Sequence, residues 1–567
     1  MSGEKSSAVE VVKQNSRHLR GTIAQGLVDP VTGNVADDDY QLLKFHGVYR
    51  QDNRDVRDER RRRKLEPDYQ FMVRLRLPGG VLTTGQWLAL DELARRYGDS
   101  VYGGGTLRIT TRQSLQIHGV RKPRLRELLQ GIHHAGLDTR GACGDDNRNV
   151  VCSVNPQQSG LHAEVYAQAR WVSEHLRWQS GAYDEIWLGG EAPGGKPESE
   201  PLFGDAYLPR KFKVSFAVPP DNDVDVLASD LAFSAIVESG TLIGYNVAAG
   251  GGMGMTYGQE NTWPRIASPI GYIDKADVWA VIVAVVGIQR DWGNRSDRSQ
   301  ARLKYTIDRH GLARFKAEVE KRLGHELGQL RPCSYEHNGD RFGWVEGENG
   351  NWHLTLSLTA GRIADTETER WRAGLRAIAE AHGGEFRLTT NQNLVVAGVA
   401  PNRRAEVDRL VEQHGLGGYR RHSGIRLNAM ACVAFPTCGL AMAEAERYLP
   451  DFLGKIEARL DRHGLLQEAI TLRLSGCPNG CARPYLGEIA LTGKAPGRYN
   501  LYLGASFSGE RMNVLYRENI TEPEVLDALD PLFARFAAER KSGEHFGDFL
   551  FRAGVTAGGD FHHAMAT

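Results

Sequence analysis

Alternating hydrophobic and polar residues mark the expected strands of this chain, and the same order of elements occurs twice. The segment 71–77 (FMVRLRL) alternates as a half-buried strand does and ends at Pro78. We expect a helix from Thr84 to Tyr97, a pair of strands over 105–120, and a further helix over about 123–135. This β-α-β-β-α order predicts a small α+β unit.

The order returns in the second half of the chain, where 352–358 predicts a strand, 366–382 a helix and 384–399 a pair of strands. Eight of the sixteen positions are identical between 105–120 (GTLRITTRQSLQIHGV) and 384–399 (GEFRLTTNQNLVVAGV), which is too many for chance. The separation of the two copies is far larger than the period of a solenoid repeat. The chain therefore carries two homologous halves.

The duplication continues more weakly beyond these segments. It places Cys152 opposite Cys432, and it sets 210–220 (RKFKVSFAVPP) roughly opposite 471–481 (TLRLSGCPNGC). The first half thus offers arginines and lysines where the second half offers cysteines. Two pseudo-symmetric halves that differ in this way are expected to bring a wall of cations to face a metal cluster.

The overall composition is that of an ordinary globular protein, with 41% hydrophobic and 25% charged residues among 567. The 70 basic residues balance 70 acidic ones, so no net charge supports nucleic-acid binding. The longest apolar run, 278–288, is too short to cross a bilayer and predicts a buried helix. The N-terminus lacks the apolar core of a signal peptide. We expect a cytoplasmic protein with no membrane contact.

Four of the seven cysteines form two close pairs. Cys432 and Cys438 are spaced C-x5-C, and Cys477 and Cys481 are spaced C-x3-C in a turn whose proline and glycine favour a compact backbone. Thiolates select zinc, copper(I) or iron–sulfur clusters, and the common iron–sulfur sites use four of them. Zinc sites usually space cysteines two to four residues apart, which only the second pair satisfies. The pattern favours an iron–sulfur cluster, with structural zinc and chance as alternatives.

A set of basic residues gathers around the duplicated segments, several of them on predicted strands where an inward-facing charge needs a partner. In the stretch RKFKV, Lys211 and Lys213 project from one face and Phe212 from the other. Together the set would suit an anionic substrate and a polycarboxylate cofactor, whereas any single member could equally be a surface or salt-bridged residue. The set comprises Arg74, Arg76, Arg108, Arg112, Arg148, Arg210, Lys211 and Lys213.

Two further stretches leave alternatives open. The run 54–64 (RDVRDERRRRK) is compatible with an exposed helix or arm, and also with contact to an acidic partner or an anionic cofactor. The glycine loop 249–254 (AGGGMG) has the spacing of neither a dinucleotide-binding motif nor a P-loop, so it either lets the backbone approach a bulky ligand or forms a turn. Because no flavin or nicotinamide motif is present elsewhere, a redox enzyme with this sequence would receive its electrons from another protein.

The segment after Cys438 favours a helix from Gly439 to Leu449, stopped by Pro450. A second helix is expected from Asp451, with Phe452, Ile456 and Leu460 on one face. Such helices would pack around a buried cluster and limit its contact with solvent. The three other cysteines lack ligand spacing and are expected to be ordinary thiols: Cys143, Cys152 and Cys333.

The motifs CVAFPTC (432–438), TLRLSGCPNGC (471–481), YLPRKFK (207–213) and the duplicated R-[IL]-T-T-x-Q-x-L resemble those of the sulfite and nitrite reductase hemoprotein family. The resemblance extends nearly end to end, from Leu19 to Phe549. It implies an α+β fold with pseudo-two-fold duplication, in which two ferredoxin-like half-domains and two larger α+β domains surround a central cofactor.

On this resemblance we expect five regions: an N-terminal extension with partner or cofactor contacts, a first ferredoxin-like half-domain, a siroheme- and substrate-binding domain, a second half-domain, and a domain that binds the [4Fe-4S] cluster and siroheme. Their expected ranges are 1–65, 66–135, 136–330, 340–415 and 420–567.

The resemblance also implies roles for individual residues. The cluster ligands would be Cys432, Cys438, Cys477 and Cys481, and Cys481 matches the cysteine whose sulfur also bridges to the siroheme iron. The substrate-binding cations would be Arg74, Arg148, Lys211 and Lys213. Contacts to the siroheme carboxylates or their surroundings would come from Arg108, Thr110, Arg112, Gln116, His118, Arg210 and Asn393.

The implied reaction is the six-electron reduction of sulfite to sulfide at a siroheme coupled to a [4Fe-4S] cluster, in sulfate assimilation and cysteine biosynthesis. The long N-terminus resembles the branch that takes electrons from an NADPH-oxidising FAD/FMN flavoprotein, and a ferredoxin-dependent enzyme is the alternative. Nitrite reduction is a second alternative; the Lys211 and Lys213 pair favours sulfite, because nitrite enzymes tend to lack the second lysine. From a different class, a non-catalytic four-cysteine metal protein would be colourless.

Overall fold

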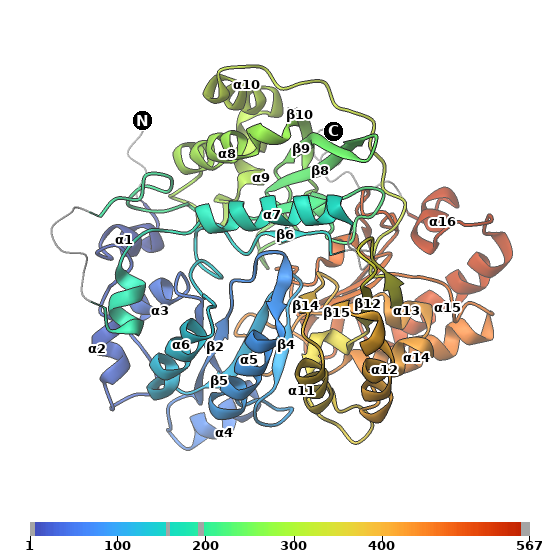
Figure 1. The fold of residues 1–567 in the computed structure, drawn as a ribbon, viewed down its shortest axis with the longest axis horizontal. Helices are drawn as coiled ribbons and strands as arrows, with labels where there is room; N and C mark the ends of the chain where they lie inside the picture. The colour runs from blue at the N-terminus through green and yellow to red at the C-terminus, as the bar shows by residue number, and fades with distance from the viewer. Residues whose placement is uncertain (1–5, 155–158, 191–197, 557–567) are drawn as a thin grey trace.

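The computed structural model describes residues 6–154, 159–190 and 198–556, so the outermost parts of the expected terminal regions 1–65 and 420–567 lie outside it. The described chain forms an α+β fold with four five-stranded sheets. Figure 1 shows two small helix-covered sheets side by side at the bottom, a larger unit above them, and the C-terminal unit at the right. The expected α+β class is therefore what the structure shows.

Each of the two small sheets belongs to one half of the chain but takes its last strand from the other half. The first sheet has the order β1 (Val48–Asp52), β2 (Tyr69–Arg74), β5 (Leu115–Val120), β4 (Leu107–Ile109) and β13 (Arg362–Ile363). The second has the order β11 (Gly343–Glu346), β12 (Trp352–Leu356), β15 (Leu394–Val399), β14 (Glu385–Leu388) and β3 (Val81–Thr83). This exchange of β13 and β3 joins the halves through backbone hydrogen bonds.

Amphipathic helices cover these sheets. In the first half they are α5 (Thr84–Tyr97) and α6 (Leu125–His134), and in the second α11 (Trp371–Ala381) and α12 (Arg404–Gln413). Thr83 and Gln86 form a capping box that starts α5 at the expected residue. The helix expected over 366–382 begins later, at Trp371, and the expected strand pairs over 105–120 and 384–399 are confirmed.

The two larger sheets have the same connectivity. One runs β6 (Val151–Cys152), β7 (Val214–Ala217), β8 (Leu231–Glu238), β9 (Thr241–Ala249) and β10 (Ser268–Asp274). The other runs β16 (Ala429–Ala431), β17 (Leu472–Ser475), β18 (Ile489–Ala495), β19 (Arg498–Leu503) and β20 (Val514–Ile520). In both, the first two pairings are parallel and the last two antiparallel. The duplication thus extends over the whole fold.

The register of these sheets corrects the alignment of the two halves. Phe216 and Leu474 are each the third residue of equivalent strands, β7 and β17. Cys152 pairs with Phe216 and Ala431 pairs with Leu474, so Ala431 is the counterpart of Cys152. Ser153 therefore corresponds to Cys432, one residue away from the expected match.

The same register continues from β7 and β17 into the turns that follow them. The turn 219–223 corresponds to 477–481, and Asp223 corresponds to Cys481. The segment 210–213 corresponds instead to 468–471, ahead of the cysteine turn.

The helix expected from Gly439 to Leu449 is absent, because residues 439–448 form turns. The amides of Met442 and Ala443 both donate to the Gly476 carbonyl, 2.8 and 3.1 Å away, and this holds the loop against the second cysteine turn. Pro450 lies in the first turn of α14 (Leu449–Arg462) rather than ending a helix, as its missing N–H allows there. The apolar face expected on this second helix is confirmed: Phe452, Ile456 and Leu460 are buried.

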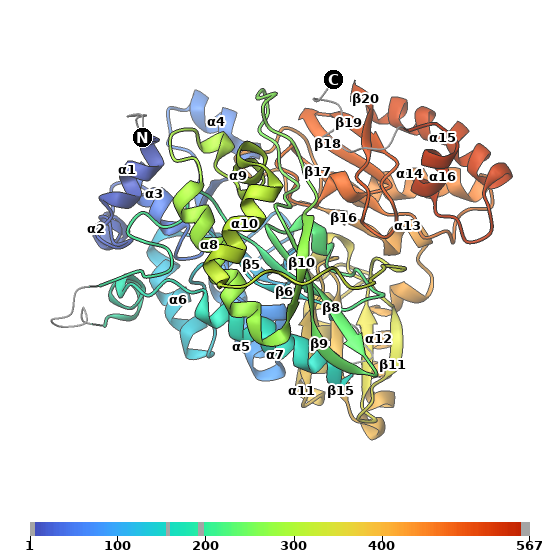
Figure 2. The same cartoon turned by 90° about the horizontal axis from the view of Figure 1, so that it is seen from above.

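The N-terminal region is only partly exposed. Helices α1 (Ala8–Gln14), α2 (Ile23–Val28) and α3 (Asp37–Leu43) pack against the first half (Figure 2), and Leu19, Ile23 and Leu43 are fully buried. Most of the basic run 54–64 lies on the short helix α4 (Arg57–Arg62), where none of the residues is buried. The expected exposed character holds for this helix but not for Arg54 or for the segment before the run.

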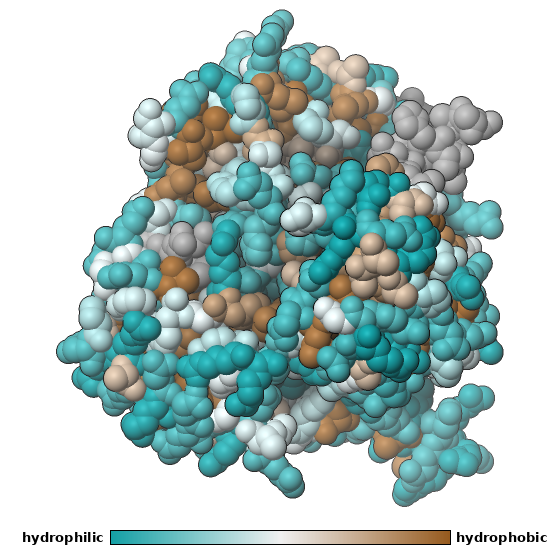
Figure 3. Space-filling model, turned by 90° about the vertical axis from the view of Figure 1, so that its right-hand side faces the viewer, coloured by the Kyte–Doolittle hydropathy of each residue, from teal (hydrophilic) through white to brown (hydrophobic). Residues whose placement is uncertain are grey.

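The remaining helices cover the two larger sheets. They are α7 (Gly160–His175), α8 (Val278–Trp292), α9 (Leu303–His310), α10 (Leu312–Leu323), α13 (Gly424–Leu427), α15 (Glu522–Glu539) and α16 (Phe546–Arg552). The apolar run 278–288 lies in α8, as expected for a buried helix. In the described part of the chain, no helix is long and apolar enough to span a bilayer. The face in Figure 3 is mainly hydrophilic, with hydrophobic residues in small separate patches.

We predict that the strand exchange couples the stability of the halves. Ile363 of β13 is fully buried in the first sheet, so Ile363→Ala should lower the free energy of unfolding by about 2–5 kcal/mol and reduce amide hydrogen-exchange protection in β4. Ile378→Ala in α11, also fully buried, is the matched control and should leave β4 protection higher than Ile363→Ala does. Equal loss of β4 protection in both variants would contradict the coupling.

Candidate functional site

A cavity with an empty volume of about 960 Å³, partly open to solvent, lies between the halves. The first half contributes the turn after β4, the segments before β6 and β7, and the glycine loop; the second contributes the second cysteine turn. The charged, hydroxyl and thiol groups that line it are Arg74, Thr110, Thr111, Arg112, Ser114, Arg148, Lys211, Lys213, Asp225, Ser229, Arg302, Cys481 and Arg483.

All four predicted substrate cations line this cavity: Arg74, Arg148, Lys211 and Lys213. Arg74 ends β2 and donates to the sulfur of Cys143 over 3.0 Å, and the Arg148 Nε donates to the Gly144 carbonyl over 3.0 Å. Among the described residues, neither lysine ammonium has a hydrogen-bond acceptor, and the buried Nε of Arg74 has no partner. These groups are therefore available to a ligand.

Burial and mutual repulsion lower the pKa values of the basic groups in the cavity. Burial first, and then the charges of Arg210, Arg302 and Arg148, lower the pKa of Lys211 to about 7. Burial, Arg302 and Lys211 lower the pKa of Lys213 well below its usual range. Nearby, burial and Arg483 lower the pKa of Arg112 to about 9. Such a concentration of cations with few carboxylates favours an anionic occupant.

The four paired cysteines lie on two loops, all as free thiols, and Cys481 of the second loop lines the cavity. Burial, and then the neighbouring Cys481 and Cys477, raise the pKa of Cys432 well above its usual range, and Cys438 adds to this effect. Only thiols that lie close together influence one another in this way. The Gly476 amide donates to the Cys432 sulfur over 3.2 Å. The two loops thus carry the four residues that the spacings predicted, and their role as ligands stays a prediction.

The described thiols do not form a site for a single metal ion. Among the described residues, no three Cys, His, Asp or Glu side chains are grouped so that they could hold one metal ion. A [4Fe-4S] cluster takes four thiolates around a larger core, and backbone donors to its sulfurs are among the features that tune it. The zinc alternative therefore has no support from the geometry.

The glycine loop packs directly against the second cysteine turn. The Met255 amide donates to the Pro478 carbonyl over 2.9 Å, and a Cβ on Gly480 would lie 2.0 Å from the Met253 carbonyl oxygen. The fully buried Lys304 anchors the loop by donating to the carbonyls of Gly252, Gly254 and Trp263. The backbone of this loop closely approaches the cysteine turn. Its approach to a bulky ligand stays a prediction.

A buried ion cluster joins the halves beside the cavity. The Asp225 carboxylate accepts from Arg473 and, over 2.5 Å, from the Nε of Arg483. Arg483 also donates to the Thr111 carbonyl over 2.8 Å and to the Thr390 carbonyl over 3.1 Å. In turn, the Thr111 hydroxyl donates to the Cys481 carbonyl over 2.8 Å. The ion cluster thereby positions the turn that carries Cys481.

The predicted siroheme contacts fall into two groups. Thr110 and Arg112 line the cavity, whereas the rest do not: Arg108, Gln116, His118, Arg210 and Asn393. Arg108 instead bonds to Glu446 over 2.7 Å and to the Ala431 carbonyl over 2.8 Å, next to Cys432.

Gln116 and His118 are buried and bonded to each other over 3.3 Å, and Arg210 lies 3.9 Å from Asp145. Asn393 donates to Asp340 over 2.7 Å, on the far side of the pseudo-symmetry axis. A direct cofactor contact for these five residues stays a prediction.

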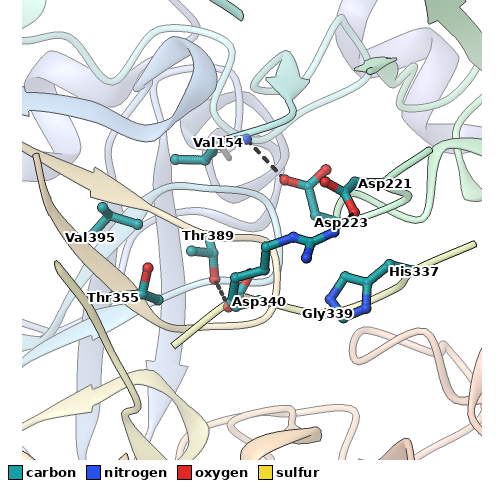
Figure 4. A pocket seen from close by; sticks show the side chains of 10 residues that line it. Val154, Asp221, Asp223, His337, Gly339, Asp340, Thr355, Thr389 and Val395 are labelled. Atoms are coloured by element: carbon teal, nitrogen blue, oxygen red, sulfur yellow. Dashed lines mark hydrogen bonds and ion pairs between the residues drawn. The ribbon is translucent and has the colours of Figure 1, made fainter. Parts of the chain in front are cut away.

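A second, smaller cavity, with an empty volume of about 310 Å³, lies at the pseudo-symmetric position (Figure 4). Its lining includes Asp223, the counterpart of Cys481, and Thr355, the counterpart of Arg74. Ser153, the counterpart of Cys432, donates to Asp223 over 2.6 Å. Asp340 accepts from Thr389, so the linker between the halves reaches into this cavity. The fold therefore builds two related cavities and gives only one of them thiols.

Several lining residues were not predicted from the sequence. Arg302 comes from the start of α9 and pairs with Asp230 over 2.9 Å, and Asn149 holds the turn at Arg112 through its side-chain amide. Arg302 lies in no recognisable motif. Arg483 follows Cys481 by only two residues, and Asp225 stands at the corresponding position of the first half, so the duplication could have identified this pair.

The fold and the site together define a nitrite and sulfite reductase. The family model described as "Nitrite and sulphite reductase 4Fe-4S domain" matches residues 143–327, and "Nitrite/Sulfite reductase ferredoxin-like half domain" matches residues 62–135 and 345–414. The chain belongs to this family. The family resemblance and the duplicated fold with two ferredoxin-like half-domains are confirmed, and the family implies siroheme and a [4Fe-4S] cluster.

The names of the relatives in this family are more specific than the family description. The chain is 58% identical over 556 residues to the "Sulfite reductase [NADPH] hemoprotein beta-component" of Xanthomonas oryzae pv. oryzae (strain PXO99A), covering 97% of each chain. It is 54% identical over 564 residues to the protein of the same name from Geobacillus kaustophilus (strain HTA426), covering 98% of each. The structure of Mycobacterium tuberculosis NirA matches with a TM-score of 0.77, at 24% identity and 97% coverage of both chains, which shows the shared fold.

We predict that Asp225→Asn destabilises the protein, because it leaves two buried guanidinium groups without their carboxylate, at a cost of about 3–5 kcal/mol. Burial alone would raise the pKa of Asp225, but Arg473 and Arg483 outweigh it and hold the pKa well below its usual range. The wild-type advantage should therefore be full above about pH 4 and shrink as the pH falls further.

Chemical unfolding at several pH values measures this effect. Asp548→Asn, which removes the carboxylate of the more exposed pair with Arg511, is the control and should change stability by about 1 kcal/mol or less. An advantage of wild type over Asp225→Asn that did not depend on pH would contradict the assigned ionisation.

Proposed function

We propose that this protein reduces sulfite to sulfide by six electrons, as the hemoprotein component of an NADPH-dependent sulfite reductase. The observation that carries the proposal is one cavity in which four basic side chains, none of them ion-paired among the described residues, face the turn that bears Cys481. The names of the relatives support the substrate and the electron source. Siroheme coupled to the cluster would supply electrons one at a time to a bound sulfur atom.

The proposed cofactor ligands are the four paired cysteines. Cys432, Cys438, Cys477 and Cys481 would hold the [4Fe-4S] cluster, and Cys481, which alone of the four lines the cavity, would face the siroheme. The cationic lining suits the many carboxylates of siroheme. Thr110 and Arg112, on the turn after β4, are placed to contact that cofactor.

The cations account for substrate binding and proton supply. Arg74, Arg148, Lys211 and Lys213 would hold the sulfite oxygens and stabilise negative charge as each S–O bond lengthens. Each oxygen that leaves as water needs two protons. Lys211, whose pKa is lowered to about 7, can donate a proton near neutral pH and be protonated again from solvent.

The electron donor is proposed to be an NADPH-oxidising flavoprotein that carries FAD and FMN, in a cytoplasmic pathway of sulfate assimilation. The name of the relatives, which specifies NADPH and a beta-component, supports a separate partner subunit. Nitrite reduction and a ferredoxin donor are the alternatives, and turnover with sulfite and nitrite, each supplied with NADPH plus flavoprotein or with ferredoxin, separates them.

We predict that Lys213→Met retains the cofactors but lowers sulfite turnover with reduced methyl viologen by about 100-fold, because one cation is lost from the developing oxyanion. Visible absorbance and iron content measure cofactor retention. Lys316→Met, at a half-buried position on α10 outside the cavity lining, is the matched control and should keep wild-type turnover. Wild-type turnover in Lys213→Met would reject the assigned role.

We also predict that Cys481→Ser loses visible heme absorbance and iron, because the cysteine that joins cluster and cavity is removed. Cys333→Ser changes another exposed thiol, outside the cavity lining, and should retain both. A normal spectrum and iron content in Cys481→Ser would exclude it as the shared ligand.

A further inference from the structure

Arg54 joins the N-terminal region to the loop that carries Cys438. Its backbone amide donates to the Pro436 carbonyl over 3.1 Å, and its Nη1 donates to the carbonyls of Cys438 and Ala441 over 3.0 and 2.6 Å. The guanidinium also lies 4.4 Å from the centre of the Phe435 ring. One arginine thus contacts four residues of the 435–441 segment, on both sides of a proposed cluster ligand.

The charge of Arg54 is not neutralised by a bonded carboxylate. Among the described residues, no carboxylate lies within ion-pair distance of its guanidinium, since the nearby Asp52 is paired with Arg57 over 2.6 Å. The neighbouring Arg447 differs, because Asp55 and Glu444 both bond to it. Arg54 is therefore a local source of positive charge at the Cys438 loop, and its own hydrogen bonds go only to neutral carbonyls.

The hydrogen bond from the guanidinium to the Cys438 carbonyl places a positive charge beside a proposed cluster ligand. Reduction of a four-thiolate cluster adds one negative charge, which a nearby cation stabilises, and local charge, hydrogen bonding and solvent exposure set the potentials of such clusters. The contacts described above also hold Phe435 over the same loop and limit its exposure.

We infer that Arg54 is a positioning residue that raises the reduction potential of the [4Fe-4S] cluster by placing an unneutralised guanidinium against the Cys438 loop. The inference rests on the proposed ligand role of Cys438. It gives the first residue of the basic run 54–64 a role that the rest of the run, on the exposed helix α4, does not share. The effect would favour acceptance of electrons from a donor.

A redox titration of the purified holoprotein, followed by electron paramagnetic resonance of the reduced cluster, tests this inference. In Arg54→Gln the ratio of reduced to oxidised cluster at a fixed potential should fall about tenfold, which corresponds to about 59 mV for a one-electron couple. Arg54→Lys keeps the charge and should stay within about twofold of wild type. Arg61→Gln makes the same charge change at an exposed residue of α4 and should leave the ratio unchanged.

Each outcome decides the question. An unchanged ratio in Arg54→Gln with full iron content would overturn the inference, and so would an equal fall in Arg54→Lys and Arg54→Gln. If Arg54→Gln does not assemble the cluster, Arg54→Lys decides alone: a wild-type ratio supports the charge effect and a tenfold fall refutes it. Cys438→Ser tests the ligand assignment separately, because retention of the cluster in that variant would overturn the assignment and leave the potentials of the Arg54 variants as measured.

Discussion

The carboxylate of Asp225 is the interaction on which the relation between the two halves depends. Asp225 and Arg483 stand at equivalent positions of the duplication, both with left-handed backbone conformations, and they bond to each other rather than to equivalent partners. Arg483 then holds the carbonyls of Thr111 and Thr390, which are themselves equivalent residues of the two half-domains. A buried carboxylate is stable here only because two guanidinium groups meet it. The pair therefore fixes the turn that carries Cys481 relative to both half-domains.

The duplicated backbone forms two related cavities, and they differ in the side chains that line them. Where one cavity has Cys481 and Arg74, the other has Asp223 and Thr355. The Thr111 hydroxyl bonds to the Cys481 carbonyl, and the equivalent Thr390 hydroxyl bonds to the Asp223 carbonyl, so the turns are held in the same way. Asymmetry of function thus needs no asymmetry of fold, and the second half-domain serves the site by supporting the cysteine loops.

Local patterns in the sequence predicted what is local in the structure. The duplicated strands, the two cysteine pairs and the lysines of RKFKV were all predicted, because each depends on short spacing. The match of Cys152 to Cys432 was one residue off, since weak identity does not fix a register that interstrand hydrogen bonds determine. The helix over 439–449 was wrong because amides of this segment bond to Gly476, a contact that helix propensity does not include. Arg302 reaches the cavity only through tertiary packing.

The two lysines of the site have no acceptor among the described residues, and this has a consequence for binding. Lys211 and Lys213 lie within the field of Arg302 and lack acceptors among the described residues, so burial and repulsion both favour their neutral forms. An anionic occupant reverses that balance, because it attracts the charged forms and raises their pKa values. Binding of siroheme carboxylates and of sulfite should therefore be coupled to proton uptake by these lysines. Lysines protonated in this way would carry protons next to the oxygens that leave as water.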